Sequence, residues 1–246
     1  MSDWQTDPRP AGGGAHYGGS IEQTLAGAAE LDVMDTIREA WERIDGIKGT
    51  VVGGVLIIYG IVLVVSAVLG SIFGFDGQSV VAGTVSQIVV MSIVYPFMAG
   101  VFMLGLRRSV GLPVDFKEQF SFYGMMLPIV AVGLLQSVLT SLGLMLLIIP
   151  GLYLAVALSL AIPLKVEKDL GVTDCLATSL RLVNRKFVPV LLLGLASTAL
   201  IVVGILSVIG WIWTIPWSAM IYAITYRQLA GYDAGGASSG PATVSY

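Results

Sequence analysis

The sequence predicts an all-α integral membrane protein with six transmembrane helices in three hairpins, each preceded by an amphipathic helix at the cytoplasmic face. Three observations lead to this fold class. Only 12% of the 246 residues are charged, whereas a soluble domain carries about 25%. Long runs between residues 50 and 226 contain no Lys, Arg, Asp or Glu. All 13 Lys and Arg residues fall on one side of the apolar stretches, and positive residues mark the cytoplasmic side. We therefore expect the cell (inner) membrane as location, with both termini cytoplasmic.

The two ends of the chain are predicted to be disordered tails around one membrane domain. Residues 1–30 contain glycine clusters at 12–14 and 18–19 and little that could be buried, and residues 230–246 have a similar composition. The membrane domain is expected to cover residues 31–229. The only histidine, His16, lies in the first tail. We expect it to be solvated and not to bind a metal.

Six apolar stretches follow one another along the membrane domain. A helix needs about 20 apolar residues to cross the hydrocarbon of a bilayer. The third and fourth stretches run together, so a hairpin turn must interrupt them, either at Gly143 or at Pro150-Gly151. The stretches are 50–73, 80–106, 123–142, 144–164, 187–209 and 211–226. Trp211, Trp213 and Trp217 begin the last stretch and are expected at the outer interface, where indole rings favour the headgroup layer.

Amphipathic segments precede the first, third and fifth stretches. In each segment four apolar residues recur at steps of four, four and three, which puts them on one helical face. The three sets are Val33, Ile37, Trp41 and Ile44; Leu112, Phe116, Phe120 and Tyr123; and Val172, Leu176, Leu180 and Val183. This pattern predicts an internal repeat of three units, each with an amphipathic helix, a span, a tight outer turn and a second span. The alternative is that any amphipathic segment beside a membrane has this pattern.

The second span of each unit carries a proline. These residues are Pro96, Pro150 and Pro216. Arg107 and Arg227 follow the first and the third of them by eleven residues, whereas Ala161 takes that position after the second. Prolines free backbone carbonyls, and broken helices form midplane binding sites in transporters. They are also ordinary kinks in membrane helices, so both interpretations stay open.

The polar groups within the spans are few and uncharged. Gln87 and Gln136 are the strongest of them, and each amide is expected to bond a neighbouring helix or, alternatively, a substrate. No Asp, Glu, Lys, Arg or His lies in the middle of a span, which argues against a proton-coupled pump, an ion channel with a charged filter and an intramembrane protease. No catalytic motif is present and Cys175 is the only cysteine. We therefore expect neither enzyme activity nor a cofactor or metal.

Two regions are candidates for contacts with lipid or a partner. Arg181, Arg185 and Lys186 form a basic cluster near the inner leaflet, which predicts either contact with anionic headgroups or only a role in setting topology. The first amphipathic helix is net acidic, so lipid attraction cannot hold it. Trp41 and apolar burial must anchor this helix.

Three stretches carry a resemblance to a known family. They are residues 147–163, which include Pro150-Gly151; residues 171–184, which include Ser179-Leu-Arg181-Leu; and the ending Tyr226-Arg-Gln-Leu229. Over residues 33–229 the chain resembles a group of uncharacterised bacterial six-span membrane proteins, which is similar to the membrane domain attached to some glycerophosphodiester phosphodiesterases. The catalytic domain of those enzymes is absent from this sequence, so no catalytic residue carries over. The resemblance implies a fold and an inner-membrane location.

Two functions are compatible with the sequence. We expect a non-enzymatic scaffold, accessory or membrane-organising protein that acts through membrane lipids, another membrane protein or a second copy of itself. The alternative is a transporter or channel for a small or lipid-like solute, with the proline kinks, Gln87 and Gln136 around a midplane cavity. A net charge of −3 gives no reason to expect nucleic acid as a partner. A hollow interior would favour the second function, and a filled interior the first.

Overall fold

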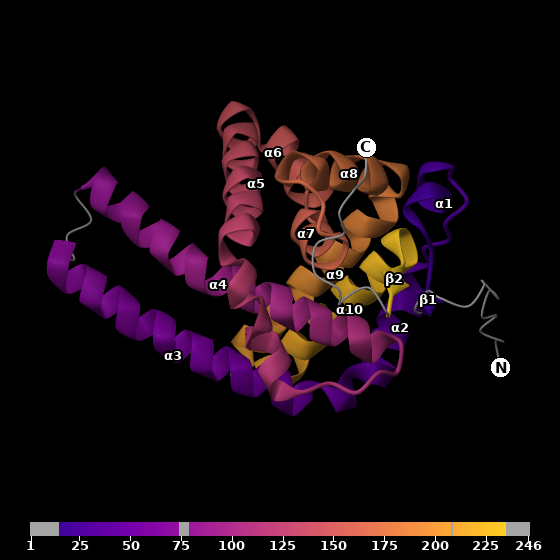
Figure 1. The fold of residues 1–246 in the computed structure, drawn as a ribbon, viewed down its shortest axis with the longest axis horizontal. Helices are drawn as coiled ribbons and strands as arrows, with labels where there is room; N and C mark the ends of the chain where they lie inside the picture. Colours follow the sequence, from indigo (N-terminus) through magenta and orange to yellow (C-terminus); the bar gives the residue numbers. More distant parts are fainter. Residues whose placement is uncertain (1–14, 74–78, 208, 235–246) are drawn as a thin grey trace.

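The computed structural model describes residues 15–73, 79–207 and 209–234, and this part of the chain is all-α apart from two very short strands (Figure 1). The helices are α1 (Ile21–Leu25), α2 (Val33–Arg43), α3 (Lys48–Phe73), α4 (Val80–Ser109), α5 (Met126–Leu146), α6 (Ile148–Ala157), α7 (Ala161–Lys168), α8 (Val172–Arg185), α9 (Phe187–Leu206) and α10 (Trp211–Ala230). Two 3₁₀ helices, η1 (Ile44–Gly46) and η2 (Phe116–Met125), precede α3 and α5. The strands are β1 (His16–Tyr17) and β2 (Tyr232–Asp233). The prediction of an all-α fold is confirmed.

Within the described residues, five helical segments are long and apolar enough to cross a membrane. They are Lys48–Phe73, Val80–Ser109, Phe116–Leu146, Ile148–Lys168 and Phe187–Leu206. Most of the side chains in α3 and α9 are not buried within the protein, and a helix that is apolar all round needs an apolar environment. These segments indicate a multi-pass membrane protein.

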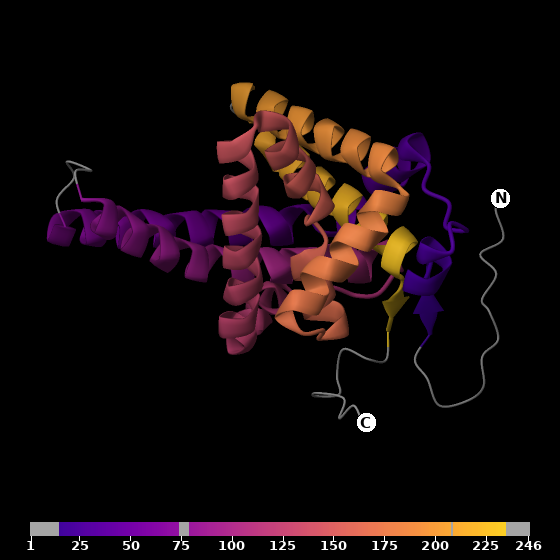
Figure 2. The ribbon, with the colours of Figure 1, turned by 90° about the horizontal axis from the view of Figure 1, so that it is seen from above.

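Helices α3 and α4 form an arm that extends away from the other helices (Figures 1 and 2). The arm is apolar but exposed along its outer half, where Val80 has 83% of its surface exposed. The inner half of α4 is different, because residues 97–106 are all buried except Met98. Helix α4 therefore joins the arm to the core of the protein.

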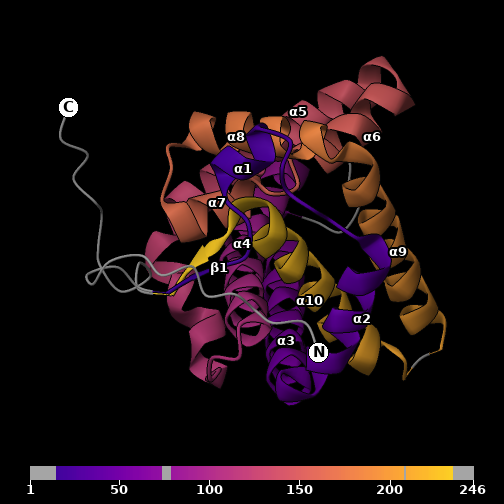
Figure 3. The same ribbon diagram turned by 90° about the vertical axis from the view of Figure 1, so that its right-hand side faces the viewer.

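Helix α10 lies at the centre of that core, between α2, α4 and α9 (Figure 3). Its residues from Met220 to Ala230 are almost all buried. Gly105 of α4 permits the close approach of the two helices, because a Cβ there would lie 3.0 Å from the Cβ of Ala223. A helix enclosed by other helices can carry hydroxyl and aromatic groups that a lipid-facing helix would not.

The turn of the second hairpin falls between the two positions expected from the sequence. Helix α5 ends at Leu146 and α6 begins at Ile148, so Leu147 alone connects them. Gly143 and Gly151 instead face one another across the hairpin, where a Cβ on Gly143 would lie 2.9 Å from the Cα of Gly151. The two glycines therefore allow the helices to pack closely and do not form the turn itself.

The amphipathic helix predicted over residues 112–123 is wrong. Gly111 has a φ of +79°, Pro113 follows, and the chain is irregular until η2 begins at Phe116. The side chain of Asp115 accepts a hydrogen bond of 2.8 Å from the Lys117 amide and so caps the 3₁₀ helix. A 3₁₀ helix has three residues per turn, so steps of four do not align side chains on one face.

The predicted tails are wrong for residues 15–30 and 230–234. Strand β1 pairs with β2 in an antiparallel ribbon, with His16 opposite Asp233. The Thr24 hydroxyl donates a 2.6 Å hydrogen bond to the carbonyl of Leu229, so α1 is attached to the end of α10. His16 is also not simply solvated, since its Nδ1 lies 2.6 Å from Asp233 Oδ1. Residues 1–14 and 235–246 of the predicted tails lie outside the described residues.

A carboxylate in this ribbon is held in its charged form. Partial burial alone would raise the pKa of Asp233, but hydrogen bonds from Lys168 and His16 outweigh burial and lower the pKa. Lys168 Nζ lies 2.7 Å from Asp233 Oδ2. The ion pair joins the C-terminal strand to α7.

The single cysteine offers a test of how α8 packs. Cys175 is fully buried, and burial raises the pKa of its thiol to about 11. Only the thiolate reacts with maleimides, so we expect alkylation in mild detergent at pH 8 to be about a hundredfold slower than after denaturation in SDS. Mass spectrometry of the intact protein measures both rates. Equal rates would contradict the packing of α8 against α7.

Candidate functional site: an apolar cavity between the helices

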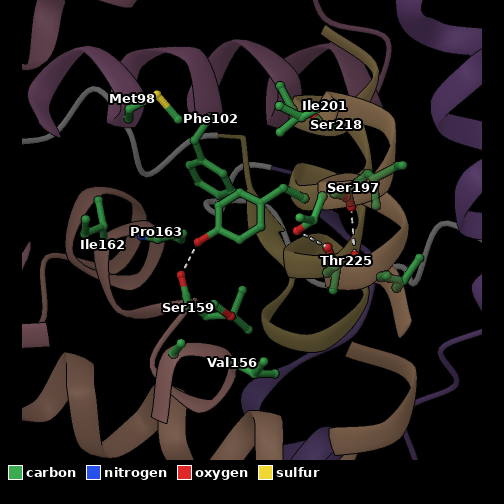
Figure 4. A pocket seen from close by; sticks show the side chains of 18 of the residues that line it. Met98, Phe102, Val156, Ser159, Ile162, Pro163, Ser197, Ile201, Ser218 and Thr225 are labelled. Carbon is green, nitrogen blue, oxygen red and sulfur yellow. Dashed lines mark hydrogen bonds between the residues drawn. The ribbon is translucent and has the colours of Figure 1, made fainter. Parts of the chain in front are cut away.

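A cavity of about 620 Å³ lies among α4, α5, α6, α7, α9 and α10, and Val55 of α3 also contributes to its lining. Figure 4 looks into it, with Met98 and Phe102 of α4 on one side and Ser218 and Thr225 of α10 on another. Binding pockets for small molecules commonly have about 300–1,000 Å³ and a mainly apolar lining with a few polar groups. The cavity has this size and this character.

The lining of the cavity carries no Asp, Glu, Lys, Arg or His among the described residues. Several of its hydroxyl groups already donate to a backbone carbonyl. Ser218 donates to Ile215 at 2.8 Å, and Thr225 donates to Ile221 at 2.7 Å. The Tyr222 hydroxyl donates to the carbonyl of Ser159. Such oxygens have used their proton and keep a lone pair that can accept a hydrogen bond.

Gln136 on α5 is the one amide among the described residues that line the cavity. Its Oε1 atom is buried and has no hydrogen-bond partner within the described part of the chain. Tyr95 of α4 lies on the same wall, and its hydroxyl is 2.8 Å from Ser137 Oγ. A buried polar atom without a partner costs about 1–3 kcal/mol. Because Oε1 is fully covered by protein atoms, a molecule in the cavity does not contact it.

The rim of the cavity consists of side chains that both line it and are exposed. Met98 of α4, Leu152 of α6 and Leu195 of α9 belong to this group, and all three are apolar. Gly194 of α9 lies beside them, and a Cβ there would meet no atom within 4 Å. The cavity therefore opens sideways onto the apolar surface of the helices.

The structure places the other predicted cavity residues elsewhere. Gln87 is exposed on the outer half of α4 and does not line the cavity. Pro96 and Pro216 are buried inside α4 and α10, next to the lining residues Phe97 and Ile215. Pro150 lies near the start of α6, away from the lining. The cavity is therefore not built around these prolines, although Pro163 of α7 does line it.

The candidate contact residues lie on two surfaces. Arg181 and Arg185 are exposed on α8, and Lys186 is partly exposed at its end. Trp41 is 48% exposed on α2, and its ring lies 4.7 Å from that of Trp217. Trp217 Nε1 also donates to the carbonyl of Ile37 at 3.2 Å. Trp217 thus packs against the first amphipathic helix, and its expected place at the outer interface stays a prediction.

Two ion pairs between arginine and glutamate join helical segments that pack together in the fold. Arg227 is 5% exposed, and its Nη2 lies 2.8 Å from Glu39 Oε2. Arg43 also contacts Glu39, at 2.9 Å. The second pair joins Arg107 and Glu118 at 2.8 Å. Glu118 follows Glu39 by 79 positions, the same displacement that separates Leu112 from Val33.

A third pair of positions with the same spacing in the sequence carries neither the glutamate nor the arginine. Thr178 follows Glu39 by the 139 positions that separate Val172 from Val33, and Ala161 replaces the arginine. Here Ser179 of α8 accepts a hydrogen bond of 3.1 Å from the Leu160 amide and donates one of 2.9 Å to the Ala157 carbonyl. These two hydrogen bonds join α8 to the end of α6 and the start of α7. The cavity opens between α6 and α9, whose residues Leu152 and Leu195 lie on its rim.

No family model, curated protein or solved structure matches the chain. The resemblance to the membrane domain of glycerophosphodiester phosphodiesterases therefore stays a prediction. The described residues define the class, which is a multi-pass membrane protein with an apolar cavity between its helices.

Proposed function

We propose that the chain crosses the cell (inner) membrane six times with both termini in the cytoplasm. The five long apolar segments and the one-sided distribution of Lys and Arg support this topology. Helix α10 supplies the sixth span, and its enclosure by other helices accounts for its hydroxyl-bearing and aromatic side chains.

Labelling from outside the cell tests this topology. In a Cys175→Ala background, we expect Ser79→Cys to react with a membrane-impermeant maleimide in intact cells. Both residues are exposed. Lys117→Cys should react only after the cells are permeabilised, because the proposed topology puts residue 117 on the cytoplasmic side. Labelling of Lys117→Cys in intact cells would overturn the topology.

We further propose that the membrane domain is built from three copies of one unit. The equivalent positions of Glu39 and Glu118, each paired with an arginine eleven residues after a proline, support the repeat. In this arrangement the Glu39–Arg227 pair links the third unit to the first. The Arg107–Glu118 pair links the first unit to the second. At the junction between the second and third units, Thr178 replaces the glutamate and Ala161 replaces the arginine. Both charges are missing there, as expected of a pair that is kept or lost together.

We propose that the protein binds a lipid-like solute inside the membrane, as a carrier or transporter. The single observation that carries this proposal is the apolar cavity of about 620 Å³ that opens sideways among the helices. A protein that acted only as a scaffold would not need a hollow interior. The uncharged lining also fits a solute that the bilayer itself supplies.

A scaffold or membrane-organising function stays a second proposal. The exposed Trp41 on the surface of α2 and the exposed Arg181 and Arg185 on α8 favour it. These groups would contact the interface and the anionic headgroups of membrane lipids, at about 1 kcal/mol per charge near the surface.

Lipids that copurify with the protein test the binding function. We expect the wild type in mild detergent to retain a lipid at close to one molecule per chain, measured by mass spectrometry of the extract. Gly194→Trp should lose most of it, because the new side chain starts in open space at the cavity. Gly83→Trp is the matched control, since a Cβ at Gly83 also meets nothing and the residue lies on the arm. Equal retention by both variants would reject the cavity as the site.

A further inference from the structure

We propose that the cavity holds the acyl chain of a membrane lipid, while the headgroup of that lipid stays outside the opening between α6 and α9. This inference rests on the proposed binding function and adds which part of the solute enters the protein. A phospholipid or a free fatty acid could supply such a chain. Three features of the cavity support the inference, namely its size, the charge of its lining and the place of its opening.

The cavity is large and offers little to hold water. Its volume is about 620 Å³, whereas an engineered apolar cavity of about 150 Å³ already stays dry and takes up small apolar molecules. A buried water molecule typically makes about three hydrogen bonds to polar groups. On this lining the hydroxyls of Thr198, Ser218 and Thr225 already donate to backbone carbonyls of their own helices. An apolar occupant therefore suits this space better than water does.

The charge of the lining keeps an ionised headgroup outside. The described lining residues include no acid and no base, so a phosphate, a carboxylate or an ammonium group would find no counter-charge there. An unpaired ion in an apolar site costs far more than a neutral polar group. A phospholipid or a fatty-acid anion therefore enters with its chain and leaves its headgroup at the opening.

The opening brings the cavity into contact with hydrocarbon. The rim residues Met98, Leu152 and Leu195 line the cavity and are also exposed. All three lie on segments that are long and apolar enough to cross a membrane. In the proposed topology these side chains face the acyl chains of the bilayer. A chain can therefore pass the rim without leaving an apolar environment.

Two groups of residues distinguish a chain inside the cavity from lipid around the protein. Phe102 of α4 and Thr225 of α10 line the cavity and are buried, so lipid outside the protein does not reach them (Figure 4). Ile149 of α6 is exposed and does not line the cavity, so lipid outside the protein does reach it. Chemical modification of the first two residues therefore reports entry.

Photocrosslinking from the two ends of a lipid tests the inference. The probes are phosphatidylcholine with a diazirine near the end of one acyl chain, phosphatidylcholine with a diazirine on its headgroup, and a fatty acid with the diazirine at the same place on its chain. Each is mixed into phosphatidylcholine vesicles that contain the protein. We expect a chain probe to modify Phe102 and Thr225 and the headgroup probe to modify neither. Mass spectrometry of peptides locates the modified residues, and the chain probe that reacts identifies the source of the chain.

Two variants show whether the modified residues are reached through the cavity. Gly194→Trp should lower modification of Phe102 and Thr225 about tenfold, which corresponds to about 1.4 kcal/mol of binding free energy, because the new side chain starts in open space at the cavity. Modification of Ile149 should not change, which shows that the variant still folds in the membrane. Gly83→Trp on the arm should leave all of these residues as reactive as in the wild type.

The possible failures of the inference and of the binding function differ. Modification of Phe102 or Thr225 by the headgroup probe would place the headgroup inside the cavity and overturn the inference, while the binding function would stand. Modification of Ile149 alone, in a protein that retains lipid in detergent, would place the bound lipid outside the cavity and also overturn the inference. Retention of no lipid at all by the wild type in detergent would instead overturn the binding function itself.

Discussion

Glu39→Gln is expected to lower the free energy of unfolding by about 3–5 kcal/mol, because it leaves the Arg227 guanidinium buried without a counter-charge. Arg227 is 5% exposed, and among the described residues its guanidinium otherwise donates to the backbone carbonyl of Ser109. For a domain of this size the loss corresponds to a fall in melting temperature of about 10 °C. Thermal unfolding in detergent, followed by intrinsic tryptophan fluorescence, measures the change.

The more exposed ion pair between Arg107 and Glu118 provides the control. Arg107 and Glu118 are 34% and 28% exposed, so Glu118→Gln should cost only about 0–1 kcal/mol. The double variant Glu39→Gln/Arg227→Met should recover part of the stability lost by Glu39→Gln, since it removes the stranded charge together with its partner. Equal losses for Glu39→Gln and Glu118→Gln would show that burial does not distinguish the two pairs.

The long apolar helices could be predicted because their signal is local. Helices α3 and α9 consist almost wholly of apolar residues, and such composition is visible in any window of about 20 residues. The position of the turn at Leu147 was harder to predict from the sequence. Gly143 and Gly151 carried the turn signal, but in the fold they serve the close approach of α5 and α6.

The ordered ends and η2 were missed for two different physical reasons. His16 and Asp233 are 217 positions apart, so no local pattern could indicate that β1 and β2 form a ribbon. In η2 the apolar spacing suits an α-helix, but the turn at Gly111 and the cap at Asp115 favour the tighter helix. Local turn chemistry therefore outweighed periodicity in this segment.

Part of the candidate site was visible in the sequence. Gln136 could be singled out because an amide is rare among the apolar residues of a span. Tyr222, Ser159 and Thr225 could not, since hydroxyl groups in membrane helices usually bond their own backbone. The cavity itself arises where several helices fail to fill the space between them, and no short pattern in the sequence records such a gap. Likewise, Arg227 could be noticed because it follows Pro216 by eleven residues, but its pairing with Glu39 is visible only in the fold.

Gly100→Val is expected to be the most damaging exchange of an uncharged residue, with a loss of about 3 kcal/mol or more. A Cβ at Gly100 would overlap the backbone carbonyl of Gln119 in η2. A side chain could rotate away, but a backbone carbonyl cannot, so η2 would have to separate from α4 and disturb the buried Gln119. Gly83→Val lies in the same helix, where a Cβ meets nothing within 4 Å, and should change stability by less than about 1 kcal/mol. Thermal unfolding of the two variants in the same detergent compares them directly. A Gly100→Val protein that is as stable as Gly83→Val would mean that η2 does not pack against α4 at this point.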